Sequence, residues 1–188
     1  PLGSPDRLEG YLFPDTYECY LGEDPKTAIN KMLVNFDRRF DDEMRAAAQE
    51  KGYSVRDIVI IASMIEKETD GTDQAHIASV IYNRLTNTSA ETVGLLGIDA
   101  TLVYALGRPI PQDDYQTADT PHNTYKYQGL PPGPISNPGM VAIRAAMNPD
   151  STSDYYYVLG NDGKHHFFKT LKGQQDFIAQ QQAEKRSG

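Results

Sequence analysis

The chain has 188 residues, 39% hydrophobic and 23% charged, a balance typical of a globular protein rather than a disordered one. The formal net charge of -8, with no block of lysine or arginine, argues against nucleic acid and an anionic membrane surface as partners. A neutral or moderately charged polymer suits this charge better. The one cysteine, Cys19, excludes an internal disulfide, and no stretch approaches the ~20 apolar residues of a membrane span.

The length suits one domain. The opening residues 1–4, Pro-Leu-Gly-Ser, resemble the remnant of a cloning and protease site, so we exclude them from the fold. Residues 5–188 are expected to form a single domain. A chain that begins this way is also expected to lack an upstream anchor or another domain.

The first elements are predicted to be an extended segment and a long helix. Residues 8–20 are aromatic and interrupted at Pro14, a pattern that favours an extended segment and a turn. A helix is expected to begin at Asp24-Pro25 and to end at Gly52, because Asp suits the N-cap and Pro suits the first helical position.

The middle of the chain predicts three more helices. Ser54, with Asp57 three residues later, matches a capping box at the start of a helix that stops near Asp70-Gly71. Apolar spacing predicts another helix over about residues 73–85 and a short one over 99–106.

The last third mixes loop, strand and helix. Residues 107–139 are rich in proline and turn formers, and a loop of this length is typical of a functional segment. The remaining pattern predicts a helix over 137–148, a hairpin of strands 155–159 and 165–168 around a turn at 161–163, and a helix over about 171–184 with a frayed tail. The predicted fold class is α+β, mainly helical with a small antiparallel β element.

A glutamate ends the most apolar segment of the chain. Residues 58–65 read as buried on nearly all sides, and Glu66 follows them directly. A carboxyl group carried there starts partly desolvated, which raises its pKa and lets it hold a proton as a general acid does. The alternative is a glutamate at a helix end that is already back in water.

The other carboxylates do not form an obvious pair with Glu66. Glu68 follows two residues later and projects about 200° away around a helix, so the two cannot be halves of one acid/base pair. Glu68 could be a structural carboxylate bonded to backbone or to Arg84, Asp99 fits an N-cap, and Glu9 could be structural or a wall of the site. A glycoside hydrolase ordinarily needs a second carboxylate. An enzyme with only one such carboxylate would need chemistry in which a single group acts first as acid and then as base.

Other reactive groupings are weak. His165 and His166 are adjacent on a predicted strand and project to opposite sides, so we expect no metal site, and nothing in the sequence calls for a cofactor. No serine or cysteine nucleophile motif and no phosphate-binding glycine loop stands out. Several of the twelve tyrosines lie in or near loops, where they could stack on sugar rings or be ordinary half-buried residues: Tyr11, Tyr17, Tyr104, Tyr125 and Tyr127.

Seven sequence blocks, in order along the chain, resemble the YceG-like family of murein transglycosylases. They span about residues 8–170: LEGYLFPDTY, IASMIEKET, VIYNRL, GIDATLVYAL, NTYKYQGLPPGPISNPG, AAMNP and GKHHFFKT. The resemblance implies a catalytic domain whose membrane anchor and LysM-like subdomain are absent from this sequence. It also implies a full-length protein anchored in the cytoplasmic membrane by one span, with this domain on the outer side.

The resemblance implies the functional residues as well. It makes Glu66, the first glutamate of Glu-Lys-Glu-Thr, the catalytic residue. The residues expected around the substrate are Glu68, Asn83, Arg84, Asp99, Thr101, Asn123, Thr124, Tyr125 and Pro132, with Glu9 added as a possible wall of the cleft. The implied partners are glycan strands of peptidoglycan, with peptidoglycan synthases or division proteins as further candidates.

The reaction implied by the resemblance is the non-hydrolytic cleavage of the β-1,4 bond after N-acetylmuramic acid, which leaves a 1,6-anhydro end. Two other functions stay open. One is a hydrolase that uses Glu66 with a distant acid such as Glu9 or Asp99. The other is a non-catalytic module that binds glycan or serves as a scaffold for division proteins.

Overall fold

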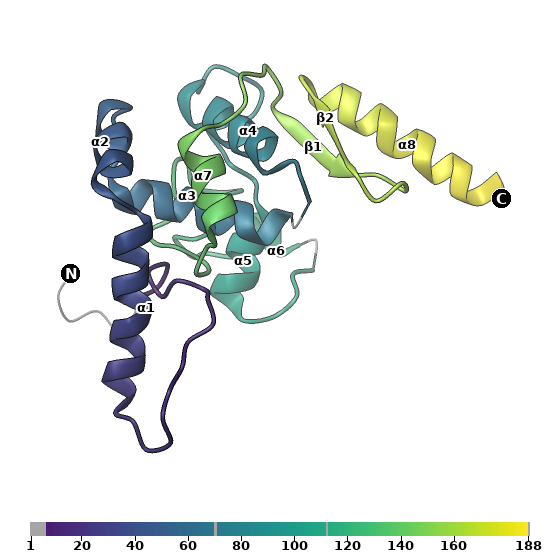
Figure 1. Ribbon diagram of the computed structural model, residues 1–188. Coiled ribbons are helices and arrows are strands. Elements are labelled where there is room, and N and C mark those ends of the chain that lie inside the picture. The colour runs from purple at the N-terminus through teal and green to yellow at the C-terminus, as the bar shows by residue number, and fades with distance from the viewer. Residues whose placement is uncertain (1–6, 70, 112, 188) are drawn as a thin grey trace.

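The computed structural model describes residues 7–69, 71–111 and 113–187 (Figure 1). The interpretation of residues 1–4 lies outside these ranges. Eight helices and a two-stranded antiparallel sheet within the described residues confirm the α+β class. The elements are α1 Pro25–Arg39, α2 Asp42–Glu50, α3 Val55–Glu68, α4 Gln74–Thr86, α5 Asp99–Leu106, α6 Asp114–Thr117, α7 Met140–Met147, β1 Tyr156–Leu159, β2 His165–Phe168 and α8 Leu171–Ser187.

Helix α3 is the centre of the core. Every residue from 58 to 65 is buried, and α2, α4, α5 and α7 pack around this helix (Figure 1). The predicted capping box is confirmed, because the Ser54 side chain accepts from the Asp57 backbone while the Asp57 carboxylate accepts from the Ser54 backbone. A buried helix with a fixed start places the groups at its other end reproducibly.

The single long helix predicted over residues 24–52 is wrong, because it is broken into α1 and α2. Its start is as predicted, with Asp24 accepting from the backbone of Lys26 and Pro25 in the first turn. The break falls at Phe40, which is fully buried, and Asp41, whose side chain caps α2 by accepting from the Met44 N–H. An aspartate that offers an N-cap competes with helix continuation.

Other boundaries differ from the predictions by a few residues. Asp99 is the first residue of α5 rather than its N-cap, which is Ile98. The 107–139 segment contains the short helix α6. Helix α7 begins at Met140 rather than near residue 137, and the Asn137 side chain accepts hydrogen bonds from two backbone N–H groups of the N-terminal segment. Helix α8 continues past Glu184 to residue 187.

The N-terminal segment crosses α3 at Gly10. Its φ is +85°, and a Cβ atom there would lie 2.6 Å from Cγ of Pro134 and from Cγ1 of Val59. Both the left-handed backbone and the close approach require glycine at this position. The segment is thereby fixed beside the loop that leads into α7.

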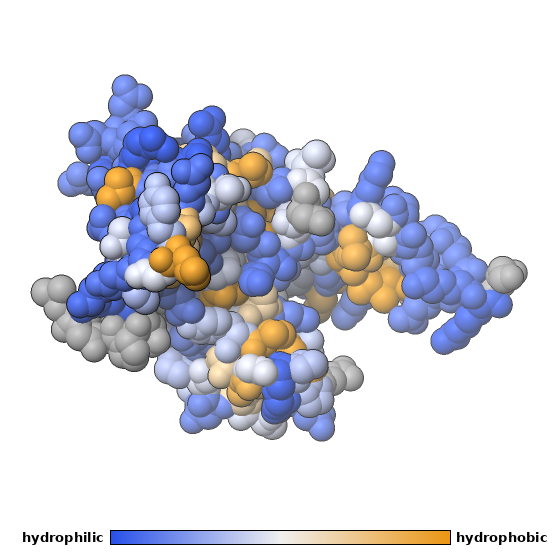
Figure 2. Space-filling model, turned by 60° about the horizontal axis from the view of Figure 1, so that its bottom comes forward, coloured by the Kyte–Doolittle hydropathy of each residue, from blue (hydrophilic) through white to orange (hydrophobic). Residues whose placement is uncertain are grey.

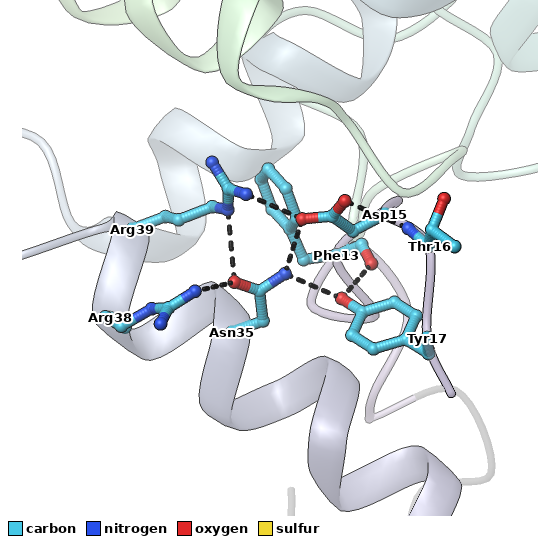
Figure 3. A network of polar contacts seen from close by, with 7 residues as sticks. All are labelled: Phe13, Asp15, Thr16, Tyr17, Asn35, Arg38 and Arg39. Atoms are coloured by element: carbon cyan, nitrogen blue, oxygen red, sulfur yellow. Dashed lines mark hydrogen bonds and ion pairs between the residues drawn. The ribbon is translucent and has the colours of Figure 1, made fainter. Parts of the chain in front are cut away.

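A polar network holds the same segment against α1 (Figure 3). The Asn35 amide nitrogen donates to Asp15 Oδ2 at 3.0 Å and to the Tyr17 hydroxyl at 2.9 Å. The Asn35 carbonyl accepts from Arg38 and Arg39, both at 3.1 Å. These contacts satisfy a buried amide completely, so they fix the segment that carries Glu9.

The hairpin and α8 lie together at one end of the molecule (Figure 1). In the antiparallel register, Tyr156 faces Phe168 and Leu159 faces His165. The face in Figure 2 is largely hydrophilic, with separate hydrophobic patches, one of them over this end. Among the described residues, no helix has the length and apolar content needed to cross a membrane.

Candidate functional site

Glu68, the last residue of α3, lies where three open cavities meet. Cavities of about 470, 480 and 460 Å³ are each lined by this side chain. Arg84, Asp99, Tyr125 and Tyr157 line the first cavity. A chain of cavities around one carboxyl group suits an extended polymer better than a small molecule.

The second and third cavities share the Glu68 side chain with the first. Lys67, Asp99, Tyr104 and Ile135 line the second. The third is formed by the end of α3, the α3–α4 connection and the hairpin, and its lining includes Thr69, Asp73, Lys164 and His165. Aromatic walls beside polar groups are typical of sugar-binding surfaces.

Burial raises the pKa of Glu68. A hydrogen bond from the Tyr157 hydroxyl to Oε2, at 2.6 Å, works in the opposite direction, and the negative charge of Asp99 raises the pKa further. The C-terminal end of α3 carries the negative pole of the helix dipole and also disfavours a carboxylate. This environment favours a protonated carboxyl group at higher pH than usual.

Asp99 lines the first cavity and accepts hydrogen bonds from two tyrosines. Tyr115 donates to Oδ2 at 3.0 Å, and Tyr125 donates to Oδ1. Burial, and then the bond to Asp99, raises the pKa of Tyr125, so its hydroxyl stays a donor. Both carboxylate oxygens of Asp99 therefore already accept hydrogen bonds from neighbouring tyrosines.

Arg84 is a buried cation that joins α4 to the hairpin. Its Nε donates to the Tyr155 carbonyl at 2.6 Å, and Nη1 donates to the Leu96 carbonyl. Its guanidinium lies 5.5 Å from the ring centroid of Tyr156 and 6.0 Å from that of Tyr157. Burial lowers the pKa of Arg84, yet a guanidinium stays charged at physiological pH. Arg84 thus fixes the strand that supplies Tyr157.

Glu66 lies in an environment different from the predicted one. The prediction that its side chain is partly desolvated is wrong, because Glu66 is exposed. Its Oε2 accepts from the Gly139 N–H at 3.0 Å, at the N-terminal end of α7. A carboxylate there is stabilised by the helix dipole. Glu66 therefore has a structural explanation, and it lines none of the three cavities that share Glu68.

Four of the other predicted residues use their polar groups to hold the backbone. Asn83 donates to the carbonyls of Thr152 and Asp154. The Thr101 hydroxyl donates to the Ile98 carbonyl at 2.7 Å, and the Thr124 hydroxyl lies 3.0 Å from the Thr101 hydroxyl and accepts from the Ile98 N–H. The fully buried amide of Asn123 donates to the carbonyls of Tyr115 in α6 and of Ala118, which follows that helix. These residues fix the loops around the groove, and a direct role in binding stays a prediction.

The last two predicted residues lie further along the walls. Glu9 accepts a hydrogen bond from Tyr104, which lines the second cavity. Pro132 is exposed, and its carbonyl accepts from Arg56 at 2.8 Å. The structure therefore brings Glu68, Arg84, Asp99 and Tyr125 together.

The sequence reasoning missed Tyr157, the direct partner of the Glu68 carboxyl group. Tyr157 lies 89 residues further along the chain. No local pattern links the two positions. The sequence did indicate that the Glu68 side chain is partly buried, because Glu68 shares a helix face with Ile61 and Met64. Both of these residues are fully buried.

Comparison with known proteins gives a consistent result. The profile of the YceG-like family matches residues 3–180. The endolytic murein transglycosylase of Bacillus subtilis (strain 168) is 37% identical over 171 residues, which cover 88% of this chain and 45% of that protein. The endolytic murein transglycosylase of Streptococcus pneumoniae serotype 2 is 34% identical over 164 residues, which cover 83% of this chain and 29% of that protein.

A solved structure shows the same fold. The crystal structure of a yceG-like protein from Listeria monocytogenes superimposes with a TM-score of 0.80 at 36% identity, covering 90% of this chain and 55% of that one. The chain spans less than half the length of the curated relatives that it matches.

Proposed function

Because this chain belongs to the YceG-like family, we propose that it is the catalytic part of an endolytic peptidoglycan lytic transglycosylase. Its substrate is a glycan strand of peptidoglycan. It cleaves the β-1,4 bond between N-acetylmuramic acid and N-acetylglucosamine without water and leaves a 1,6-anhydro end.

The observation that carries this proposal is the position of Glu68. Its carboxyl group lies where the three cavities meet, and burial raises its pKa. Three cavities that share one carboxyl group offer room for several sugar units, which suits cleavage within a strand. We therefore assign the acid and base roles to Glu68 and not to Glu66, whose exposed carboxylate accepts from the N-terminal end of α7.

In the first step, protonated Glu68 donates its proton to the glycosidic oxygen as the bond to the anomeric carbon breaks. The raised pKa keeps that proton on the carboxyl group to a higher pH than an ordinary glutamate would hold it. Loss of the leaving group gives an oxocarbenium-like sugar. The Asp99 carboxylate, which shares two of the cavities with Glu68, contributes negative charge that stabilises this cation.

In the second step, the carbon-6 hydroxyl of the same sugar attacks the anomeric carbon. Its proton leaves to a base, and the ionised Glu68 is the simplest acceptor. The nucleophile belongs to the substrate and is held by the ring, so its proximity contributes much of the rate. The Tyr157 hydroxyl stabilises the carboxylate form of Glu68 between the two steps, because it donates to Oε2.

One alternative is supported by a specific observation. Asp99 lines two of the same cavities as Glu68, as a second carboxylate of a hydrolase would. However, Tyr115 and Tyr125 donate to both of its oxygens, so it is poorly placed to activate water. A non-catalytic role in glycan binding does not require a carboxyl group with a raised pKa.

The full-length protein is proposed to act outside the cytoplasmic membrane, where peptidoglycan lies. Both curated relatives are at least twice as long as the matched region. We propose that an anchoring span and a LysM-like subdomain belong to the longer protein. Peptidoglycan synthases or division proteins are the expected protein partners.

The test is digestion of purified, peptide-free glycan strands, with the products read by mass spectrometry. We expect new ends that are lighter by one water than those made by a muramidase. Products with ordinary reducing ends would establish the hydrolase instead. Strand binding without cleavage at any pH would establish the binding module.

A further inference from the structure

A second proton-handling group lies in the third cavity, opposite the end of α3. His165 Nδ1 lies 2.7 Å from Asp73 Oδ2, and Asp73 Oδ1 accepts from the Thr69 hydroxyl at 2.7 Å. All three residues line the cavity that Glu68 also lines. The mechanism above uses none of them.

The contact with Asp73 fixes which ring nitrogen of His165 can accept a proton. Burial works against ionisation of Asp73, but bonds from Thr69 and His165 outweigh it and lower its pKa. An ionised carboxylate can only accept, so Nδ1 carries a hydrogen and Nε2 is the basic nitrogen of a neutral ring. No hydrogen bond to Nε2 occurs in the part of the chain that the structure describes. The His165 side chain keeps 12% of its surface exposed.

We propose that His165 is the base that accepts the proton of the substrate's carbon-6 hydroxyl, with Asp73 as its positioning residue and Glu68 as the acid. This inference rests on the proposed transglycosylase function. It divides between two residues the work that a single carboxyl group would otherwise do twice.

The step balances without any further reactant. The carbon-6 O–H bond breaks, its proton goes to His165 Nε2, and its oxygen forms the bond to the anomeric carbon. The bond from that carbon to the glycosidic oxygen breaks, and the leaving oxygen takes the proton of Glu68. The enzyme is then left with an imidazolium and a carboxylate in one cavity, and proton exchange through water restores both groups.

The surroundings of His165 support a change of charge there. The titratable or charged groups around it are Asp73, Glu68 on α3, Tyr157 on β1 and its own neighbour Lys164. The Tyr157 ring meets the imidazole edge to face, with centroids 5.6 Å apart. A positive charge on His165 lowers the pKa of Glu68, so the two groups are close enough to influence each other. Protonation of His165 during ring closure therefore stabilises the carboxylate formed in the first step.

The adjacent residue, His166, is a matched control. It also pairs with an aspartate, at 3.1 Å from Asp162, but on the other face of the hairpin. It packs against Phe177 of α8 and does not line the cavity of Glu68. A substitution there tests the effect of losing a histidine–aspartate contact from the hairpin without touching the groove.

The experiment compares His165→Gln, Asp73→Asn and His166→Gln with the unmodified protein on purified glycan strands across pH 4–9. For His165→Gln we expect kcat to fall about 100-fold, the usual contribution of a general base, with KM within about twofold. The loss of rate at low pH, caused by protonation of the base, should disappear in this variant and persist in His166→Gln. Asp73→Asn should lose about tenfold.

A second variant covers the case in which His165→Gln folds poorly. Imidazole added to His165→Ala should restore anhydro products at a rate that follows the concentration of neutral imidazole. The inference would be overturned if His165→Gln had the same rate as His166→Gln and the same loss of rate at low pH. It would also be overturned if imidazole failed to restore the activity of His165→Ala. If one of these two results is found and Glu68→Gln is still inactive, this inference fails but the proposed function stands. If the unmodified protein makes no anhydro ends, both fall.

Discussion

Replacing each glutamate of the Glu-Lys-Glu-Thr segment by glutamine, one at a time, separates the catalytic role from the structural one. Glu68→Gln keeps an oxygen that accepts from Tyr157 but removes the transferable proton. Glu66→Gln keeps an oxygen that accepts from the Gly139 N–H but removes the charge at the start of α7. The two variants change the same number of atoms two residues apart, so each is the control for the other.

The expected magnitudes follow from the two environments. General acid catalysis contributes about 10²–10⁴-fold, so Glu68→Gln should lower kcat by up to about 10⁴-fold, or roughly 5 kcal/mol of transition-state stabilisation. Glu66→Gln should stay within about twofold of the unmodified rate, since its side chain lies outside the three cavities. It should lower Tm slightly, because a favourable contact between charge and helix dipole is lost.

The stability of Glu68→Gln should change with pH in a defined direction. Folding raises the pKa of Glu68 above its ordinary value of 4.5, so the fold binds this proton more tightly than the unfolded chain does. The unmodified protein therefore loses stability as the pH rises from about 4.5 through the folded pKa. The glutamine variant does not lose it, so its Tm should exceed that of the unmodified protein at neutral pH and approach it near pH 4.

The assay is the initial rate of anhydro-product release from peptide-free strands, with Tm measured by differential scanning calorimetry. An inactive Glu66→Gln beside an active Glu68→Gln would refute the assignment and return the catalytic role to Glu66. Loss of activity in both variants with normal Tm values would show that the two residues act together.

Three further substitutions test the supports of the site. Tyr157→Phe removes a hydrogen bond that lowers the pKa of Glu68. We therefore expect kcat to fall about tenfold and the loss of rate at high pH to begin at a higher pH. A loss of rate that begins at the same pH would contradict this. Arg84→Met leaves two carbonyls without their donor and should lower the free energy of unfolding in urea by about 3 kcal/mol, whereas a neutral result would show that the guanidinium is dispensable. Gly10→Ala should cost about 2 kcal/mol or more, measured by thermal unfolding, because φ is +85° and the new methyl group would collide with a proline ring. Gly52→Ala, where φ is +81° and no atom lies within 4 Å, should cost only about 1 kcal/mol, and equal costs would contradict the steric argument.

Local patterns predicted most of the fold. The capping box at Ser54, the Asp24-Pro25 helix start and the hairpin of residues 155–168 are all confirmed, because each depends on groups a few residues apart. The break between α1 and α2 escaped prediction, since the apolar spacing continues across it. Burial of Phe40 and capping by Asp41 decide it, and burial depends on the tertiary fold.

The site was harder to predict, because distant segments create it. The apolar run pointed to Glu66, yet the exposed side of α3 begins there and the backbone of residue 139 supplies its partner. Glu68 gains its burial and its hydrogen bond from a tyrosine on β1. The helical face shared with Ile61 and Met64 favoured burial of Glu68, but the cavities around it depend on how the hairpin and α5 pack against α3.

The most direct test of non-hydrolytic cleavage is digestion of glycan strands in water labelled with heavy oxygen. Ring closure by the sugar's own hydroxyl takes no atom from the solvent, so the new ends should carry no label and should be anhydro sugars. Label at the new ends would show that water attacks the anomeric carbon, and it would contradict the account.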